Sequence, residues 1–173
     1  MTHLRCGIMT VSDRSYRGER ADGSGPILVD RILQLEWQVS ATVVVPDEAD
    51  KISQQLAAWS DQGMIDLILT TGGTGFAPRD VTPEATTAVL EKLTPGIAEA
   101  MRLASLQKTP HAMLSRSVAG IRKQTLIINL PGSPKAALEN FEVVIPVIPH
   151  AIELLQESST SEKNHQFNQS RGV

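Results

Sequence analysis

Short apolar runs alternate with segments of helical periodicity along most of the chain. Four runs have the length and apolar content of buried strands, and they cover residues 4–12, 39–45, 64–69 and 124–130. Between them, apolar residues recur at three- and four-residue spacing, as in Ile52, Leu56 and Trp59. Strands that alternate with helices are typical of parallel sheets, so the pattern predicts a three-layer α/β sandwich with a mostly parallel central sheet and helices on both faces.

Prolines and capping residues mark where several helices should begin. Pro26 opens a helix after the polar loop 13–25, and Thr82 and Pro83 are placed to start another that ends near Leu93. Further helices are expected around residues 97–104, 135–141 and 151–156, with a loop at residues 111–120. One domain is expected over residues 1–157. The polar segment 158–173 has too few large apolar residues to pack, so it is predicted to be a disordered tail.

Composition excludes several classes of protein. The 173 residues are 3% aromatic and carry a formal net charge of -3, which argues against base stacking and against a DNA-binding surface. The single cysteine, Cys6, allows no internal disulfide and is expected in the core, and the four histidines show no metal-ligand spacing. The chain lacks a membrane-length apolar run and a recognisable secretory signal, so we expect a cytoplasmic protein that contacts neither membrane nor nucleic acid.

The candidate chemistry lies in loops that directly follow the four strand runs. The carboxyl ends of parallel strands form one edge of an open α/β sheet, and ligands bind at that edge. Glycines, hydroxyls and charged groups should therefore converge there. The loops include Ser12-Asp13, Pro46-Asp47, Thr71-Gly72-Gly73-Thr74-Gly75 and Gly132-Ser133-Pro134-Lys135.

Two of these loops favour anion binding. Three glycines between Gly72 and Gly75 free the backbone, so that successive N–H groups can form an anion nest flanked by threonine hydroxyls. The segment is neither a Walker A loop nor a dinucleotide fingerprint, and a turn shaped only by packing is the alternative. The second loop opens a helix, where Ser133 and the positive charge of Lys135 can hold an anion, although Ser133 also fits an ordinary helix cap.

Asp47 and Asp80 are the carboxylates that could accompany phosphates. Mg²⁺ prefers one or two carboxylates together with phosphate oxygens, and Asp80 lies five residues beyond Gly75. The alternatives are structural: Asp47 also fits the N-cap of the helix that follows it, and Asp80 fits a turn before a helix. Arg116 and Ser115 lie in the predicted loop, where they could reach the site or only face solvent.

The motifs together resemble the MogA/MoaB family of molybdenum-cofactor biosynthesis. The most specific are Leu69-Thr70-Thr71-Gly72-Gly73-Thr74-Gly75 and Arg79-Asp80-Val81-Thr82-Pro83-Glu84. They are joined by Val11-Ser12-Asp13-Arg14, Gly23-Ser24-Gly25, Val45-Pro46-Asp47-Glu48, Leu114-Ser115-Arg116 and Asn129-Leu130-Pro131-Gly132-Ser133-Pro134-Lys135. The resemblance covers residues 4–157 and is closest to MogA-type molybdopterin adenylyltransferases.

The resemblance implies a trimeric enzyme that uses Mg²⁺ and ATP. The terminal phosphate of molybdopterin would attack the α-phosphorus of ATP, giving adenylyl-molybdopterin and pyrophosphate, and a molybdate-inserting partner would take the product. Asp47 and Asp80 match the family's catalytic and metal-binding carboxylates. The remaining matches would bind substrate or nucleotide or border the pocket: Ser12, Asp13, Thr71, Gly72, Gly73, Thr74, Gly75, Gly132, Ser133 and Lys135.

Two other functions are compatible with the sequence. A MoaB-like protein would bind molybdopterin with little catalysis, and a domain related to CinA-type proteins would hydrolyse a nucleotide pyrophosphate. The two intact carboxylates, Asp47 and Asp80, argue against the first alternative. The Arg79-Asp80-Val81-Thr82-Pro83-Glu84 segment is more similar to MogA than to CinA.

Overall fold

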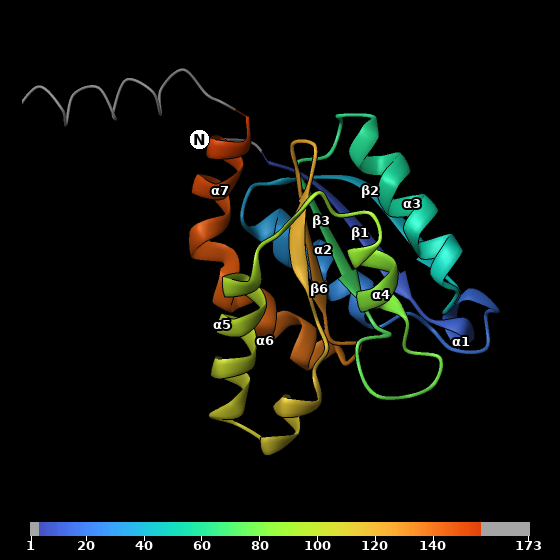
Figure 1. The fold of residues 1–173 in the computed structure, drawn as a ribbon. Helices are drawn as coiled ribbons and strands as arrows, with labels where there is room; N and C mark the ends of the chain where they lie inside the picture. The colour runs from blue at the N-terminus through green and yellow to red at the C-terminus, as the bar shows by residue number, and fades with distance from the viewer. Residues whose placement is uncertain (1–3, 157–173) are drawn as a thin grey trace, which may run out of the picture.

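The computed structural model describes residues 4–156 of the chain. Within them, a six-stranded sheet has the order β2-β1-β3-β6-β5-β4 (Figure 1). Its strands are β1 (Arg5–Val11), β2 (Gln38–Val45), β3 (Leu67–Thr71), β4 (Lys92–Leu93), β5 (Ala119–Arg122) and β6 (Thr125–Leu130). The pairs formed by β2, β1, β3 and β6 are parallel, whereas β5 and β4 extend the sheet in antiparallel pairs. The prediction of a mostly parallel sheet is confirmed.

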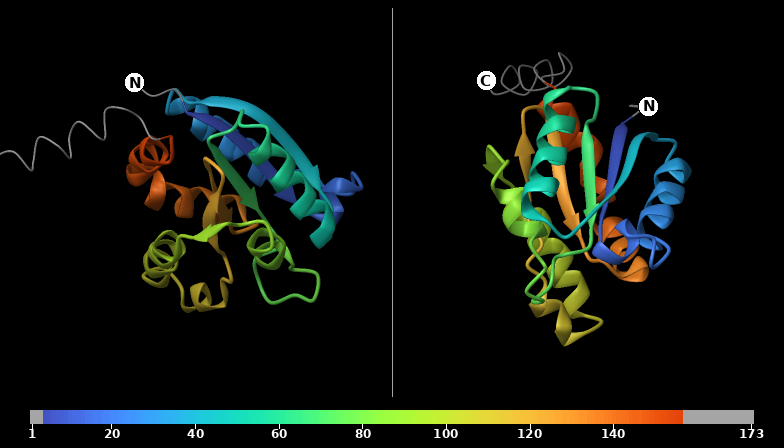
Figure 2. Two further views of the ribbon diagram at one scale, coloured as in Figure 1. Left: turned by 45° about the horizontal axis from the view of Figure 1, so that its top comes forward. Right: turned by 90° about the vertical axis from the view of Figure 1, so that its right-hand side faces the viewer.

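Helices cover both faces of this sheet. One face packs against α2 (Ser24–Gln34), α5 (Pro95–Leu106), α6 (Pro134–Val144) and α7 (Ile148–Leu155). The other face packs against α3 (Ala49–Asp61) and α4 (Thr82–Thr87), and the right-hand view of Figure 2 shows α3 and α2 on opposite sides of the sheet. Short helices α1 (Asp13–Tyr16), η1 (Pro110–Leu114) and η2 (Ile145–Val147) lie in the connections. The predicted three-layer sandwich is therefore confirmed.

The segment between α4 and β6 differs most from the sequence-based prediction. Residues 111–120, predicted as a loop, contain most of η1 and the start of β5, and the helix predicted to end near Leu93 ends at Thr87. The chain turns away after α4 because the N–H of Glu91 donates to the carbonyl of Ile121 (2.8 Å) and β4 then pairs with β5. Pairing between residues far apart in sequence decides this segment, and local periodicity does not report it.

Several helix boundaries also differ from the prediction. The loop after the first strand begins with α1, and α2 starts at Ser24 rather than Pro26. The earlier start arises because the Asp22 carboxylate accepts hydrogen bonds from the N–H groups of Ser24 and Gly25 (3.0 Å each). The last helix, α7, starts at Ile148, since its first turn tolerates the missing N–H of Pro149. The predicted disorder of residues 158–173 lies outside the described residues.

Two further expectations concern the core and the membrane. Cys6 is fully buried in the sheet, and burial raises the pKa of its thiol to about 12, which confirms its assignment to the core. Among residues 4–156, no helix is long and apolar enough to cross a membrane.

An ion pair fastens the sheet at the edge opposite the carboxyl ends of the parallel strands. The buried Asp66 carboxylate accepts hydrogen bonds from the Arg5 side chain (2.7 and 3.1 Å) and from Nε2 of Gln156 (2.8 Å). Burial alone would raise the pKa of Asp66, but the hydrogen bonds and charge of Arg5 hold it below the usual value. The stabilisation is therefore present above the pKa of the unfolded chain and is lost as pH falls through the folded-state pKa.

We expect Asp66→Asn to lower the free energy of unfolding by about 1.5–3 kcal/mol at neutral pH, because hydrogen bonds to a charged group are lost. The difference from the parent protein should shrink as the pH falls and Asp66 becomes protonated. Denaturant unfolding of both proteins from neutral to strongly acidic pH measures this. A difference that stayed constant with pH would show that the charge of Asp66 does not contribute.

Candidate functional site

A cavity of about 430 Å³ lies at the carboxyl ends of β1, β2, β3 and β6. It brings together eight of the site residues predicted from the sequence: Ser12, Asp47, Thr71, Gly72, Gly73, Asp80, Gly132 and Ser133. The other four, Asp13, Thr74, Gly75 and Lys135, do not line it. The strand-end loops therefore converge as expected, and the loop between β3 and α4 is the large green loop in the lower part of Figure 1.

Gly72 and Gly73 occupy positions that only glycine fits. Their φ angles are +101° and +63°, in the region that other L-residues rarely adopt. A Cβ atom on Gly72 would lie 2.3 Å from the backbone oxygen of Val11, and one on Gly73 would lie 2.4 Å from Oγ1 of Thr82. The Thr82 hydroxyl donates to the carbonyl of Gly72 (2.9 Å), so α4 holds the loop in this shape.

The glycine loop offers unused backbone donors. The N–H of Gly72 donates to the carbonyl of Leu130 (3.2 Å) and is therefore not available to a ligand. The N–H groups of Gly73, Thr74 and Gly75 have no acceptor among the described residues. These consecutive donors have the composition of an anion nest.

Thr71 and Thr74, on either side of Gly72 and Gly73, differ in their surroundings. The Thr71 hydroxyl is buried and donates to the carbonyl of Pro131 (2.7 Å), so it joins the loop after β3 to the loop after β6. Thr74 and Gly75 line a second cavity of about 300 Å³, with Pro131, Arg102 and other residues of α5, η1 and α6. Both cavities are therefore lined by residues of the loop after β3 and of the loop after β6, the two glycine-containing loops.

The loop after β6 supplies a free hydroxyl. Ser133 occupies the N-cap position of α6, but its side chain makes no capping hydrogen bond and has no partner among the described residues. Gly132 lies against the glycine loop, because a Cβ atom there would be 3.1 Å from Cα of Gly72. Lys135 is exposed on the first turn of α6. The helix-cap alternative therefore accounts for the position of Ser133 but leaves its hydroxyl free for a ligand.

Asp13 and Asp47 are joined by reciprocal hydrogen bonds. The N–H of Asp13 donates to Oδ2 of Asp47 (2.7 Å), and the N–H of Asp47 donates to Oδ1 of Asp13 (3.1 Å). Arg79 forms a two-pronged ion pair with Asp13, with both hydrogen bonds at 2.9 Å. Desolvation works to raise the pKa of Asp13, but the N–H of Asp47 and the Arg79 guanidinium hold it below the usual value. Asp13 therefore remains ionised and positions Asp47 rather than lining the cavity.

Asp47 and Asp80 each present one unpaired carboxylate oxygen. Asp47 is not the N-cap of α3, because Glu48 takes that position. Burial raises the pKa of Asp47, with further contributions from the charges of Asp13 and Asp80. Asp80 also stabilises a turn, as its structural alternative predicted, because its Oδ2 accepts a hydrogen bond from the N–H of Ala77 (3.0 Å). Its Oδ1, like Oδ1 of Asp47, has no hydrogen-bond partner among the described residues.

Mg²⁺ fits this donor set. No group of three or more His, Cys, Asp or Glu side chains that could hold a metal occurs among residues 4–156. Mg²⁺ does not require such a cluster, because proteins often bind it through one or two carboxylates and substrate phosphates. Negative groups that raise the pKa of Asp47 would also favour a cation beside it.

Arg116 fastens the loop that carries Asp80. Its backbone N–H donates to the carbonyl of Thr74 (3.0 Å), and its guanidinium donates to the carbonyls of Gly75 (2.7 Å) and Asp80 and pairs with Glu84. Arg116, for which the sequence allowed either a place at the site or a solvent-facing one, therefore supports the site. The Leu114-Ser115-Arg116 motif was the feature of the sequence that could have indicated this role.

Sequence reasoning missed two charged residues that line the cavity, Arg20 and Asp22. The Asp22 carboxylate accepts hydrogen bonds from the N–H groups at the start of α2 and from the hydroxyl of Thr10 (2.7 Å). It therefore attaches the loop after α1 to β1. The loop has no periodicity, so only the Gly23-Ser24-Gly25 motif hinted that it reaches the site.

Comparison with known proteins identifies the class to which this fold and site belong. The model of a family described as "Probable molybdopterin binding domain" matches residues 7–150. The chain belongs to this family.

Relatives and solved structures agree with that assignment. The chain is 49% identical over 165 residues to gephyrin of Dictyostelium discoideum, covering 90% of this chain and 23% of that protein. It is 44% identical over 160 residues to molybdopterin adenylyltransferase of Helicobacter pylori, covering 90% and 89%. The crystal structure of the molybdopterin biosynthesis enzyme MoaB from Thermus thermophilus superposes with a TM-score of 0.84 at 52% identity, covering 90% and 98%. The chain thus spans about a quarter of the length of the gephyrin it matches.

Proposed function

We propose that this protein is a molybdopterin adenylyltransferase of molybdenum-cofactor biosynthesis. An oxygen of the terminal phosphate of molybdopterin bonds to the α-phosphorus of ATP, the bond from that phosphorus to the bridging oxygen breaks, and pyrophosphate leaves. The observation that carries the proposal is the cavity in which two glycine-containing loops face two carboxylates with unpaired oxygens. Similarity to the molybdopterin adenylyltransferase of Helicobacter pylori over 90% of this chain supports it.

The residues of the site have distinct roles in this proposal. The N–H groups of Gly73, Thr74 and Gly75 bind phosphate oxygens, and Gly132, Ser133 and Lys135 bind an anion on the molybdopterin side. Asp47 and Asp80 hold Mg²⁺, which neutralises phosphate charge when bound. Ser12 and Thr71 shape the cavity, and Asp13 positions Asp47.

The chemistry matches these residue types. Nucleotidyl transfer depends mainly on positioning the two substrates and neutralising their charge. Backbone donors and carboxylates supply both, and no covalent intermediate with the protein is needed. The thiol of Cys6 is buried with a raised pKa, which is unfavourable for a nucleophile.

Incubation with Mg-ATP and purified molybdopterin separates this function from the two alternatives. The proposal expects adenylyl-molybdopterin together with pyrophosphate. Tight binding of molybdopterin without product would favour a MoaB-like binding protein. Hydrolysis of ATP in the absence of molybdopterin would favour a nucleotide pyrophosphatase.

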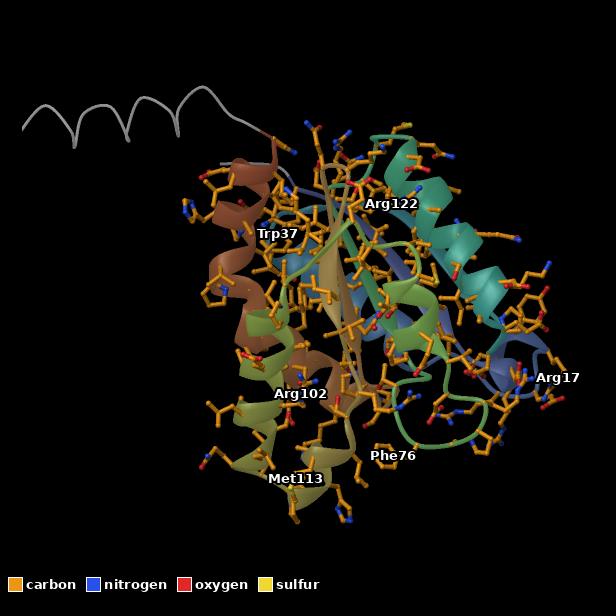
Figure 3. All side chains as sticks on the ribbon, in the orientation of Figure 1. Arg17, Trp37, Phe76, Arg102, Met113 and Arg122 are labelled. Carbon is orange, nitrogen blue, oxygen red and sulfur yellow. The ribbon has the colours of Figure 1, made fainter. Side chains whose placement is uncertain are left out.

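We further propose that the protein acts as a homotrimer in the cytoplasm and passes its product to a molybdate-inserting protein. Exposed apolar side chains on the neighbouring helices α5 and η1 support an apolar contact between subunits: Leu103, Leu106, Met113 and Leu114. Figure 3 shows Met113 at the lower end of the molecule, where η1 lies.

The double substitution Leu103→Glu with Met113→Glu is expected to convert the trimer to monomers, because charges would be buried without partners in the contact. Light scattering at micromolar concentration measures the change. Leu33→Glu, at an exposed position on α2, is the control and should leave the trimer intact. A monomeric parent protein would contradict the assembly, and a trimeric double variant would contradict its assignment to α5 and η1.

A further inference from the structure

The cavity at the carboxyl ends of the strands has a surplus of negative side chains. Among the described residues, three acidic residues line it, Asp22, Asp47 and Asp80, and Arg20 is the one basic residue in its lining. The substrates in the proposed function carry phosphates, which these carboxylates repel unless positive charge lies between them. Arg20 is therefore placed to supply positive charge.

The guanidinium of Arg20 has no partner among residues 4–156, and no hydrogen bond or ion pair holds it. Three other arginines near the site are occupied: Arg17 pairs with Glu19 (2.7 Å), Arg79 pairs with Asp13 (2.7 Å) and Arg116 pairs with Glu84. Figure 3 shows Arg17 at the outer side of the molecule, beyond α1. Among the described residues, Arg20 alone combines a free guanidinium with a place in the lining of the cavity.

The chain on both sides of Arg20 is fixed by local hydrogen bonds. On one side, the N–H of Glu19 donates to the carbonyl of Arg14 (2.9 Å), and the N–H of Gly18 donates to the carbonyl of Ser15 (3.1 Å). On the other side, the Asp22 carboxylate is bound by Thr10 and by the start of α2. The backbone of Arg20 is thus held at the cavity while its side chain stays free.

The ion pair between Arg17 and Glu19 also prevents Glu19 from pairing with Arg20. Glu19 is the direct neighbour of Arg20 in sequence and could pair with it, but both of its oxygens accept from Arg17 (2.7 and 3.2 Å). A planar guanidinium with five donors suits phosphate oxygens, to which it can donate two parallel hydrogen bonds.

We propose that Arg20 binds a phosphate group of a substrate in this cavity. The identity of the phosphate, from ATP or from molybdopterin, rests on the proposed function. The contact is made by the side chain of Arg20, so it adds a positive charge to the backbone donors of the glycine loop.

Isothermal titration of Arg20→Gln with Mg-ATP and, separately, with molybdopterin tests this proposal. We expect the Kd for one of the two ligands to rise about tenfold, equivalent to about 1.4 kcal/mol, with an unchanged circular dichroism spectrum and Tm. Arg20→Lys should recover part of the affinity, because it restores the charge without the fork of donors. Weakened binding of Mg-ATP places Arg20 on the nucleotide, and weakened binding of molybdopterin places it on the pterin phosphate.

Arg14→Gln is the matched control, because Arg14 is exposed on the same segment but does not line the cavity. Its Kd values should stay at those of the parent protein. Unchanged binding of both ligands by Arg20→Gln, or an equal loss with Arg14→Gln, would overturn the role of Arg20. If the parent protein binds both ligands but makes no product, the proposed reaction fails while the Arg20 contact is still decided by these titrations.

Discussion

Asp80→Asn is expected to lower adenylyl transfer by about 10²-fold or more, which corresponds to about 2.7 kcal/mol of activation free energy. Asp80 lines the cavity, and its Oδ1 has no partner among the described residues, while its Oδ2 accepts from the N–H of Ala77. Asparagine can keep an oxygen toward Ala77 but removes the charge that would hold Mg²⁺ on the ATP phosphates. The protein should therefore fold normally and still bind molybdopterin.

The measurement is kcat at saturating Mg-ATP, together with the Kd for molybdopterin. Ser133→Ala should show the opposite pattern, because the free Ser133 hydroxyl is proposed to contact molybdopterin. In that variant the Kd for molybdopterin should rise by a larger factor than kcat falls. If Asp80→Asn turned over at a near-normal rate, Asp80 would be a turn residue only, as its hydrogen bond to Ala77 also permits.

Gly72→Ala should impair both stability and catalysis. At φ +101° an L-residue is strained, and the new Cβ would meet the backbone oxygen of Val11 at 2.3 Å. Neither atom is at the end of a flexible side chain, so the loop or β1 must shift. We expect a loss of about 1–3 kcal/mol from the free energy of unfolding. Displacement of the phosphate-binding donors should add a fall of about 10²-fold in kcat/KM.

Denaturant unfolding and steady-state kinetics measure the two effects. Gly96→Ala is the matched control, because a Cβ at Gly96 meets no heavy atom within 4 Å and its φ is not in the left-handed region. Its stability and activity should be close to those of the parent protein. A Gly72→Ala variant as active as Gly96→Ala would show that the shape of the loop does not matter.

The layers of the fold were predictable because they depend on local signals. Apolar runs and proline-started helices defined the α/β alternation, and all four predicted strands are present. The strand β5 was missed because Gly120 gives it the composition of a loop. In the structure that glycine allows close approach, since a Cβ there would lie 2.4 Å from Leu90 and 2.6 Å from the Lys92 carbonyl. A contact between residues so far apart in the chain cannot be predicted from the local sequence around Gly120.

The candidate site was predictable to the extent that it follows the ends of strands. Asp47, Gly72 and Ser133 each lie in the loop that follows a strand, and all three line the cavity. Asp13 was placed in the pocket by the same reasoning, but its carboxylate is engaged by Arg79, which is distant in sequence. Arg20 was not foreseen, because its position depends on hydrogen bonds that fold a loop without periodicity.

The most direct test of the proposed reaction is transfer of label from ATP carrying labelled α-phosphorus. With Mg²⁺ and molybdopterin present, the label should appear in adenylyl-molybdopterin, and one pyrophosphate should be released for each molecule of product. Omission of molybdopterin should abolish both the transfer of label and the release of pyrophosphate. Label recovered only as free AMP at the same rate with and without molybdopterin would contradict the assignment of this protein as an adenylyltransferase.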